Sequence, residues 1–286
     1  MTPLSFRFGT VGSPKSTPKK PGGSPGAILR SRELGLDALE LGWVRSVRVK
    51  EETCAEIQSF GQENDVLLSV HAPYYINLNA DEKEWPKSRQ RLWDAAYYGH
   101  LAGASDIIFH PGSYFAQPPQ DVLKVAIPRL ETLAEELSAD GIQVVLRPET
   151  MGKSAMLGSL EDTLAMSKVV SRVEPCLDFA HLHARPGDGS MNSYDEWARV
   201  LEQYGEVLGE EGLRRLHIHL SGIEYGEKGE QNHLPLEEAD IDLEAVLQAL
   251  QEFGCSGRIL CESPVMEEDA LKMQQVWMEL TGEERD

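Results

Sequence analysis

The sequence predicts an α/β protein built as one closed (β/α)8 barrel. The chain has 286 residues, a length at which such barrels form a single domain. Eight short apolar runs alternate with amphipathic stretches of helical length, and strands alternating with helices predict a parallel sheet. Polar residues that can bind metals stand at the ends of most of these runs. We therefore expect residues 1–286 to form one barrel domain, with a metal site at the C-terminal face of its strands.

The eight expected strands share a short apolar core that Gly, Pro or a polar residue closes. In chain order they lie at residues 4–10, 38–43, 66–73, 106–112, 143–150, 174–181, 216–222 and 257–264. Segments 119–141 and 241–254 are examples of the amphipathic helices expected between them. The Pro- and Gly-rich segment 9–26 follows the first strand and precedes its helix, so it is interpreted as a loop at the barrel mouth.

The net charge of −20, from 27 basic and 47 acidic residues, counts against simple electrostatic binding of nucleic acid. The basic residues are unevenly spread, however. Residues 1–32 contain no acid and six bases, namely Arg7, Lys15, Lys19, Lys20, Arg30 and Arg32. A second group comprises Lys87, Arg89 and Arg91. Two interpretations stay open: a solvated loop, or a local basic rim for phosphate contacts.

Four scattered cysteines without a CxxC pair suggest reduced thiols in a cytoplasmic protein. The N-terminal segment does not have the pattern of a signal peptide, and no apolar stretch approaches the length of a membrane span. We therefore expect a cytoplasmic protein that has no membrane partner. We also expect a monomer, although the sequence itself does not determine the oligomeric state.

Seven candidate metal ligands end six successive strands and should converge on one face of the barrel. They are His71, His110, Glu149, Asp178, His181, His219 and Glu262. Each alone has a structural explanation, such as a hydrogen-bonded histidine or a helix cap. Three carboxylates in one barrel mouth, however, would repel one another unless cations balance them. Histidine mixed with Asp and Glu suits zinc, manganese or iron.

The number of metals separates two reaction classes. Glu149, Asp178, His219 and Glu262 would satisfy a single divalent ion. His71, His110, His181 and the loop residue His233 would then have no ligand role, whereas a second and third ion would use them if Glu149 bridged two metals. Closely spaced metals favour in-line displacement at phosphorus. The surplus histidines therefore favour phosphoester hydrolysis.

The segments "SVHAPYYINL", "FHPGS", "RPET", "LDFAH", "HLSG" and "ILCES" together resemble the endonuclease IV family, in the family's order and over nearly the whole chain. Its members are (β/α)8 enzymes with a trinuclear zinc site that cleave double-stranded DNA on the 5′ side of abasic sites. The resemblance implies two or three Zn²⁺ ions, with Mn²⁺ as the alternative metal, and hydrolysis by a zinc-activated hydroxide.

Carried onto this chain, the resemblance implies that His71, His110 and Glu149 hold one zinc. Glu149 would bridge to a second zinc held by Asp178, His219 and Glu262, which makes Glu149 and Glu262 the candidate catalytic residues. His181 and His233 would hold the third zinc.

Tyr74 matches the family's aromatic residue beside the extruded abasic nucleotide, although packing at the mouth explains it equally well. Lys15 and Arg45 are further candidates for substrate binding. His217 is a candidate support for a ligand, and Arg147 is expected to pair with a neighbouring acid.

The chain departs from the family in the loop of the third metal. The family has Asp-x-His there, whereas this chain has Gln231-Asn232-His233, and a glutamine oxygen is a poor zinc ligand. Glu230 is adjacent and is an alternative ligand. The sequence leaves open whether Gln231 or Glu230 takes the place of the aspartate, or whether the third site stays weak.

Two rival functions remain. A single-metal sugar isomerase or epimerase would need only Glu149, Asp178, His219 and Glu262, and an acidic protein suits a small neutral substrate. Alternatively, a protein with a weakened third site could bind damaged DNA without cutting it.

Overall fold

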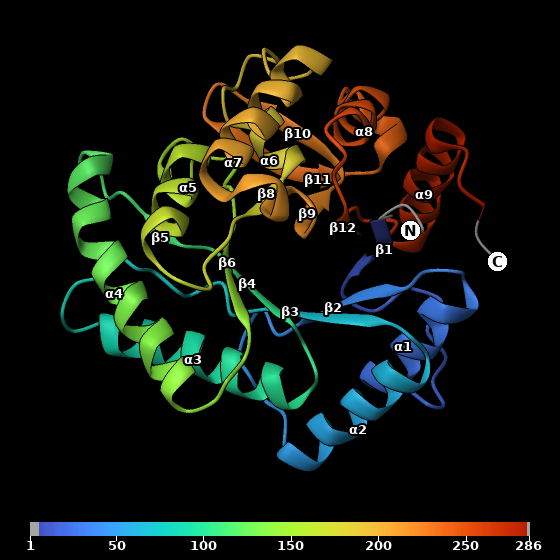
Figure 1. The fold of residues 1–286 in the computed structure, drawn as a ribbon, viewed down its shortest axis with the longest axis horizontal. Helices are drawn as coiled ribbons and strands as arrows, with labels where there is room; N and C mark the ends of the chain where they lie inside the picture. Colours follow the sequence, from blue (N-terminus) through green and yellow to red (C-terminus); the bar gives the residue numbers. More distant parts are fainter. Residues whose placement is uncertain (1–5, 285–286) are drawn as a thin grey trace.

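Eight parallel strands form the wall of the barrel in the computed structural model, which describes residues 6–284 (Figure 1). They are β1 (Phe6–Val11), β2 (Ala38–Gly42), β3 (Leu67–His71), β4 (Asp106–Phe109), β6 (Val145–Pro148), β8 (Cys176–Asp178), β9 (Leu216–Leu220) and β12 (Gly257–Cys261). Their order in the sheet is β6-β4-β3-β2-β1-β12-β9-β8. Backbone hydrogen bonds from Leu146 to Arg172 and from Thr150 to Cys176 join β6 to β8 across the remaining gap. The predicted (β/α)8 barrel is confirmed.

Nine helices lie outside the strands or at the barrel mouth within residues 6–284 (Figure 1). They are α1 (Gly23–Glu33), α2 (Glu51–Glu63), α3 (Trp85–Leu101), α4 (Pro119–Ala139), α5 (Leu160–Val169), α6 (Phe179–Ala184), α7 (Tyr194–Leu213), α8 (Leu243–Glu252) and α9 (Glu267–Thr281), besides a 3-10 turn at Leu236–Glu238. In this part of the chain no helix is long and apolar enough to cross a membrane.

Two small antiparallel ribbons follow strand ends. One pairs β5 (Gly112–Ser113) with β7 (Met156–Leu157), and the other is the hairpin of β10 (Gly222–Gly226) and β11 (Gly229–Leu234). The hairpin matters for function because it continues directly from β9 and carries the candidate ligand His233. The sequence did not predict either ribbon.

All eight expected strands are found, although residues 4 and 5 of the first lie outside the described residues. The strand expected at 174–181 is shorter than predicted, since β8 ends at Asp178. The Asp178 carboxylate accepts a hydrogen bond of 2.7 Å from the backbone N–H of His181 and so caps the short helix α6. This turn brings the side chains of Asp178 and His181 to the same end of the barrel.

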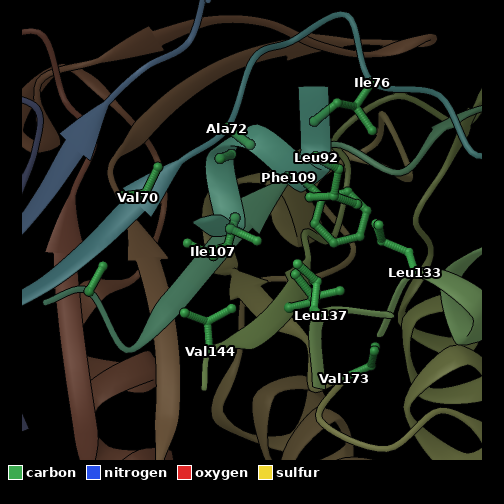
Figure 2. Packing of buried hydrophobic residues seen from close by; sticks show 14 of the residues in the cluster. Val70, Ala72, Ile76, Leu92, Ile107, Phe109, Leu133, Leu137, Val144 and Val173 are labelled. Carbon is green, nitrogen blue, oxygen red and sulfur yellow. The ribbon is translucent and has the colours of Figure 1, made fainter. Parts of the chain in front are cut away.

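The apolar core lies between the strands and the outer helices. On β4, Ile107 and Phe109 are fully buried and belong to the same cluster as Leu133 and Leu137 of α4 (Figure 2). Alternate residues of a strand point to opposite faces, so Asp106 faces the barrel interior. The outward face therefore supplies hydrophobic packing, while the inward face is free to carry polar groups.

A buried ion network closes the interior near the N-terminal ends of the strands. Asp106 contacts Arg147 Nε at 2.7 Å and Arg258 Nη2 at 2.9 Å, and Arg147 Nη1 lies 3.2 Å from Glu174. The expectation that Arg147 pairs with an acid is confirmed. Burial alone would raise the pKa of Asp106, but the charges of Arg258 and Arg147 outweigh this effect and hold that pKa far below its usual range.

We expect Asp106→Asn to lower the free energy of unfolding at pH 7 by about 3–5 kcal/mol, because it leaves the buried Arg258 guanidinium without its counter-charge and Arg147 with Glu174 alone. The folded-state pKa of Asp106 is depressed, so this stabilisation is complete above the unfolded-state pKa of about 3.9 and is lost as the pH falls below it. Urea unfolding between pH 7 and pH 3 should show the difference between wild type and variant narrowing below about pH 4. Asp121→Asn, at an exposed pair with Lys124, is the control and should change little. A difference that stays constant with pH would contradict this account.

Candidate metal centre

The structure brings all eight predicted metal ligands together at the C-terminal face of the strands. His71 and Asp178 are the last residues of β3 and β8, and His219 is the last but one of β9. His110, Glu149 and Glu262 come directly after β4, β6 and β12. His181 lies on α6 and His233 on β11. Consecutive strands of a barrel end on one rim, which explains why residues spread over most of the chain meet here.

Glu149 lies at the centre of the site and is fully buried. Its Oε2 atom is 3.3 Å from His71 Nε2 and 3.3 Å from His110 Nε2. Its Oε1 atom is 3.2 Å from His181 Nδ1 and 3.5 Å from His219 Nδ1. Glu149 therefore belongs to two groups of potential ligands, one with His71 and His110, the other with Asp178, His219 and Glu262. Within each group the ligand atoms lie within 4.8 Å of one another.

Several buried polar atoms of these groups make no hydrogen bond although they face one another. They are His71 Nε2, Glu149 Oε1, Glu149 Oε2, Asp178 Oδ2, His219 Nδ1 and Glu262 Oε2. Buried polar atoms without a partner are rare in folded proteins, and these ones converge from different strands. Imidazole nitrogens mixed with carboxylate oxygens form the donor set that suits zinc or manganese. The residues present therefore fit divalent metal ions.

The charges in the site favour a cation as well. Burial raises the pKa of Asp178, and the neighbouring Glu149 and Glu262 raise it further against the opposing charge of His181. For Glu149 the effect of burial is outweighed by His110 and other histidines, which hold its pKa well below the usual range. In return, Glu149 raises the pKa of His71 to about 9 in spite of burial. Histidines and carboxylates thus favour each other's charged forms, and a bound divalent ion would neutralise the same carboxylates.

A third group of potential ligands consists of His181, Glu230 and His233, and it includes Glu230 but not Gln231. Glu230 Oε2 lies 3.6 Å from His181 Nε2, whereas Gln231 is exposed. Across the hairpin, Glu224 pairs with Asn232 and Tyr225 with Glu230, so Gln231 is the extra residue of a β-bulge. The bulge shifts the alternation of side chains and lets Glu230 and His233, three residues apart, reach the same site.

Two glycines allow the hairpin to lie close to the loop after β6. A Cβ on Gly229 would lie 2.1 Å from the carbonyl oxygen of Gly152, and φ at Gly229 is +89°. The backbone N–H of Glu230 donates to that same carbonyl at 3.0 Å. On the other side, a Cβ on Gly152 would come within 2.7 Å of the Glu230 Cβ atom. This close approach holds Glu230 against His181.

The candidate substrate-binding residues lie around the mouth. Tyr74 is 46% exposed, and its ring stacks on His110 with 5.0 Å between ring centroids. Lys15 is exposed in the loop after β1, and the Glu267 carboxylate fixes this loop by accepting the backbone N–H groups of Lys15 and Ser16 at 2.7 and 2.8 Å. Arg45 is exposed in the loop after β2. Their roles in substrate binding stay predictions.

Sequence reasoning missed Glu40. This residue is fully buried on β2, and its carboxylate contacts His217 and His219 on β9 across the barrel interior. The sequence does contain an indication of a buried polar role, since Glu40 is the one charged residue in the apolar run 38–43. His217, expected to support a ligand, binds this same carboxylate.

Residues 28–280 match the family model described as xylose isomerase-like TIM barrel. The chain belongs to this family. An uncharacterised protein of Methanocaldococcus jannaschii is 37% identical over 274 residues, which cover 96% of this chain and 97% of the relative.

The solved structures that share this fold include an endonuclease and sugar epimerases. Endonuclease IV from Thermus thermophilus matches with a TM-score of 0.70 and 21% identity, over 96% of this chain and 99% of its own. A D-tagatose 3-epimerase-like protein matches with a TM-score of 0.69 and 18% identity, over 90% and 92% of the two chains. The likeness to endonuclease IV is confirmed for the fold, and the epimerase-like protein shares this fold equally.

We expect Glu230→Gln to lower the number of tightly bound ions by one, because it removes the only carboxylate of the third group. Gln231→Ala is the matched control one residue away and should leave the metal content unchanged. Elemental analysis of desalted proteins purified side by side measures both numbers. Loss of an ion in Gln231→Ala but not in Glu230→Gln would show that the assignment of Glu230 is wrong.

Proposed function

We propose that this protein is a metal-dependent phosphodiesterase that uses two or three zinc ions to cleave double-stranded DNA on the 5′ side of abasic sites. The observation that carries the proposal is the position of Glu149 between two groups of ligands. When bound, neighbouring divalent ions polarise a phosphoryl oxygen, activate water and stabilise the leaving oxygen. Manganese is the alternative metal.

The surplus of ligands favours this function over single-metal chemistry. Glu149, Asp178, His219 and Glu262 already complete the coordination of one ion. The other five residues of the neighbouring groups have no role in a single-metal isomerase; they are His71, His110, His181, Glu230 and His233. Assembling them costs free energy through buried charge, so their convergence is best explained by further ions.

Different side chains would have different roles in the proposed reaction. Glu149 and Glu262 hold the metals, and no side chain acts as a covalent nucleophile. Tyr74 offers a half-exposed ring at the mouth, next to His71 and His110, on which the nucleotide at the abasic site can pack. Lys15 and Arg45 supply positive charge at the rim of an acidic protein, where a DNA backbone would pass.

The second candidate function is a single-metal sugar epimerase. The four-residue group around Glu149 is sufficient for it, and the net charge of −20 suits a small neutral substrate better than DNA. Binding of damaged DNA without cleavage is the third candidate. Metal-loaded protein that converts a ketohexose to its epimer and holds one ion per chain would establish the epimerase instead.

The direct test is nicking of a duplex that carries one abasic site. We expect cleavage 5′ to the site, which stops when a chelator is added. Glu149→Gln should slow it about 100-fold or more, since the variant loses the ligand shared between two ions. Glu174→Gln changes a buried carboxylate near the N-terminal end of β8 and should retain cleavage. Wild-type protein that binds the duplex with its metals in place and leaves it intact would overturn the hydrolase proposal.

Binding of DNA should depend on salt concentration, whereas binding of a neutral sugar should not. We expect Lys15→Gln and Arg45→Gln each to weaken binding to the abasic duplex and to reduce the slope of log K against log salt by about 1. Lys168→Gln, exposed near the C-terminal end of α5, is the matched control. Binding measured at salt concentrations between about 50 and 200 mM gives the slopes. Slopes that do not differ from wild type would remove both residues from the proposed DNA contact.

A further inference from the structure

The barrel interior below the metal centre holds a buried carboxylate that is not itself grouped with the metal ligands. Glu40 Oε2 accepts hydrogen bonds from Ser69 Oγ at 3.0 Å and from His217 Nε2 at 2.9 Å. His219 Nε2 lies 3.1 Å from Oε1 and 3.3 Å from Oε2 of the same carboxylate. All four residues are fully buried. Glu40 thus connects β2 and β3 with β9 across the interior of the barrel.

The two ring nitrogens of His219 face different groups. Nε2 faces Glu40, while Nδ1 lies 3.5 Å from Glu149 and 3.5 Å from Glu262, on the side of the metal ligands. An ionised carboxylate can only accept hydrogen bonds, so Glu40 requires the proton of His219 to reside on Nε2. In the neutral ring, Nδ1 then carries the lone pair that a metal needs.

Two buried side chains from different strands hold the Glu40 carboxylate in place. Ser69 Oγ on β3 and His217 Nε2 on β9 both donate to its Oε2 atom. These two hydrogen bonds limit how the carboxylate can turn. The position of Glu40 is therefore fixed from β3 and from β9.

We propose that Glu40 is a positioning residue, which fixes the ring orientation and the tautomer of His219 and thereby tunes the metal affinity of the group formed by Glu149, Asp178, His219 and Glu262. The inference rests on the metal-binding part of the proposed function. It is independent of whether the substrate is DNA or a sugar.

A carboxylate that served only the fold would not need this arrangement. Apolar side chains fill the interior of most barrels of this type, and a buried ion pair is seldom more stabilising than well-packed apolar residues. Here the network at Asp106 already joins strands near the N-terminal ends. Glu40 adds a second buried charge one layer closer to the metal ligands, and one of its partners is itself a predicted ligand.

The test is the affinity of the whole protein for Zn²⁺, measured by competition with a chromogenic chelator near neutral pH. We expect Glu40→Gln to weaken the binding of one ion by about 10- to 100-fold, the range found when carboxylates behind metal-bound histidines are removed. Ser69→Ala takes away one hydrogen bond to the same carboxylate and should weaken that ion by about fivefold. Glu174→Gln is the matched control, because it makes the same chemical change in a buried carboxylate remote from the metal ligands.

Thermal unfolding of the metal-free proteins distinguishes positioning from general destabilisation. Weakened Zn²⁺ binding in Glu40→Gln with unchanged binding in Glu174→Gln supports the proposal, whichever of the two unfolds at the lower temperature. Unchanged affinity in folded Glu40→Gln, or an equal loss in both variants, overturns it. Should Glu40→Gln fail to fold, Ser69→Ala decides in the same way. Failure of the proposed function is seen separately, in wild-type protein that binds Zn²⁺ but does not nick abasic DNA.

A second readout concerns the atom that binds the metal. In the Zn²⁺-loaded wild type, ¹⁵N NMR of labelled histidine should show His219 bound through Nδ1, with its proton on Nε2. Coordination of His219 through Nε2 contradicts the proposal, because that nitrogen would then be unable to donate to Glu40.

Discussion

A carboxylate removed from water has to be matched by positive charge, and in this barrel that requirement centres on Glu149. Its two oxygens face four histidines that arrive from β3, from the ends of β4 and β9 and from α6. The buried Asp178 and the partly buried Glu262 add two further acids to the same group. The centre therefore depends on the closed barrel, because only closure brings the strand ends into one ring.

The polar groups inside the barrel are arranged in layers along its axis. Asp106 with its two arginines forms the lowest layer, Glu40 with His217 the next, and the metal ligands the uppermost. Hydrophobic packing is left to the outward faces of the strands, as on β4 (Figure 2). Each layer joins strands that are not neighbours in the sheet, which holds the barrel wall in shape beneath the site. Such rigidity is what a metal centre needs, since its ligands have to keep their positions with or without the ion.

Much of this structure could be predicted from the sequence, because both the strands and the ligands are local features of it. The eight apolar runs and the residues at their ends can be read without knowing how the strands pair, and the fold rule then places the ligands together. Glu40 was missed for the opposite reason. Its role depends on a contact with His217, which is 177 residues away in the sequence and comes close only once the barrel has closed. Glu230 was left undecided because a bulge depends on the pairing of β10 with β11.

The central claim is that Glu149 is shared by two metal ions. The most direct measurement is anomalous X-ray diffraction from crystals of the metal-loaded protein, collected on both sides of the zinc absorption edge. The account predicts separate peaks on the two sides of Glu149, one beside His71 and His110 and the other beside Asp178, His219 and Glu262. A single peak beside the second group, in protein saturated with zinc, would contradict it.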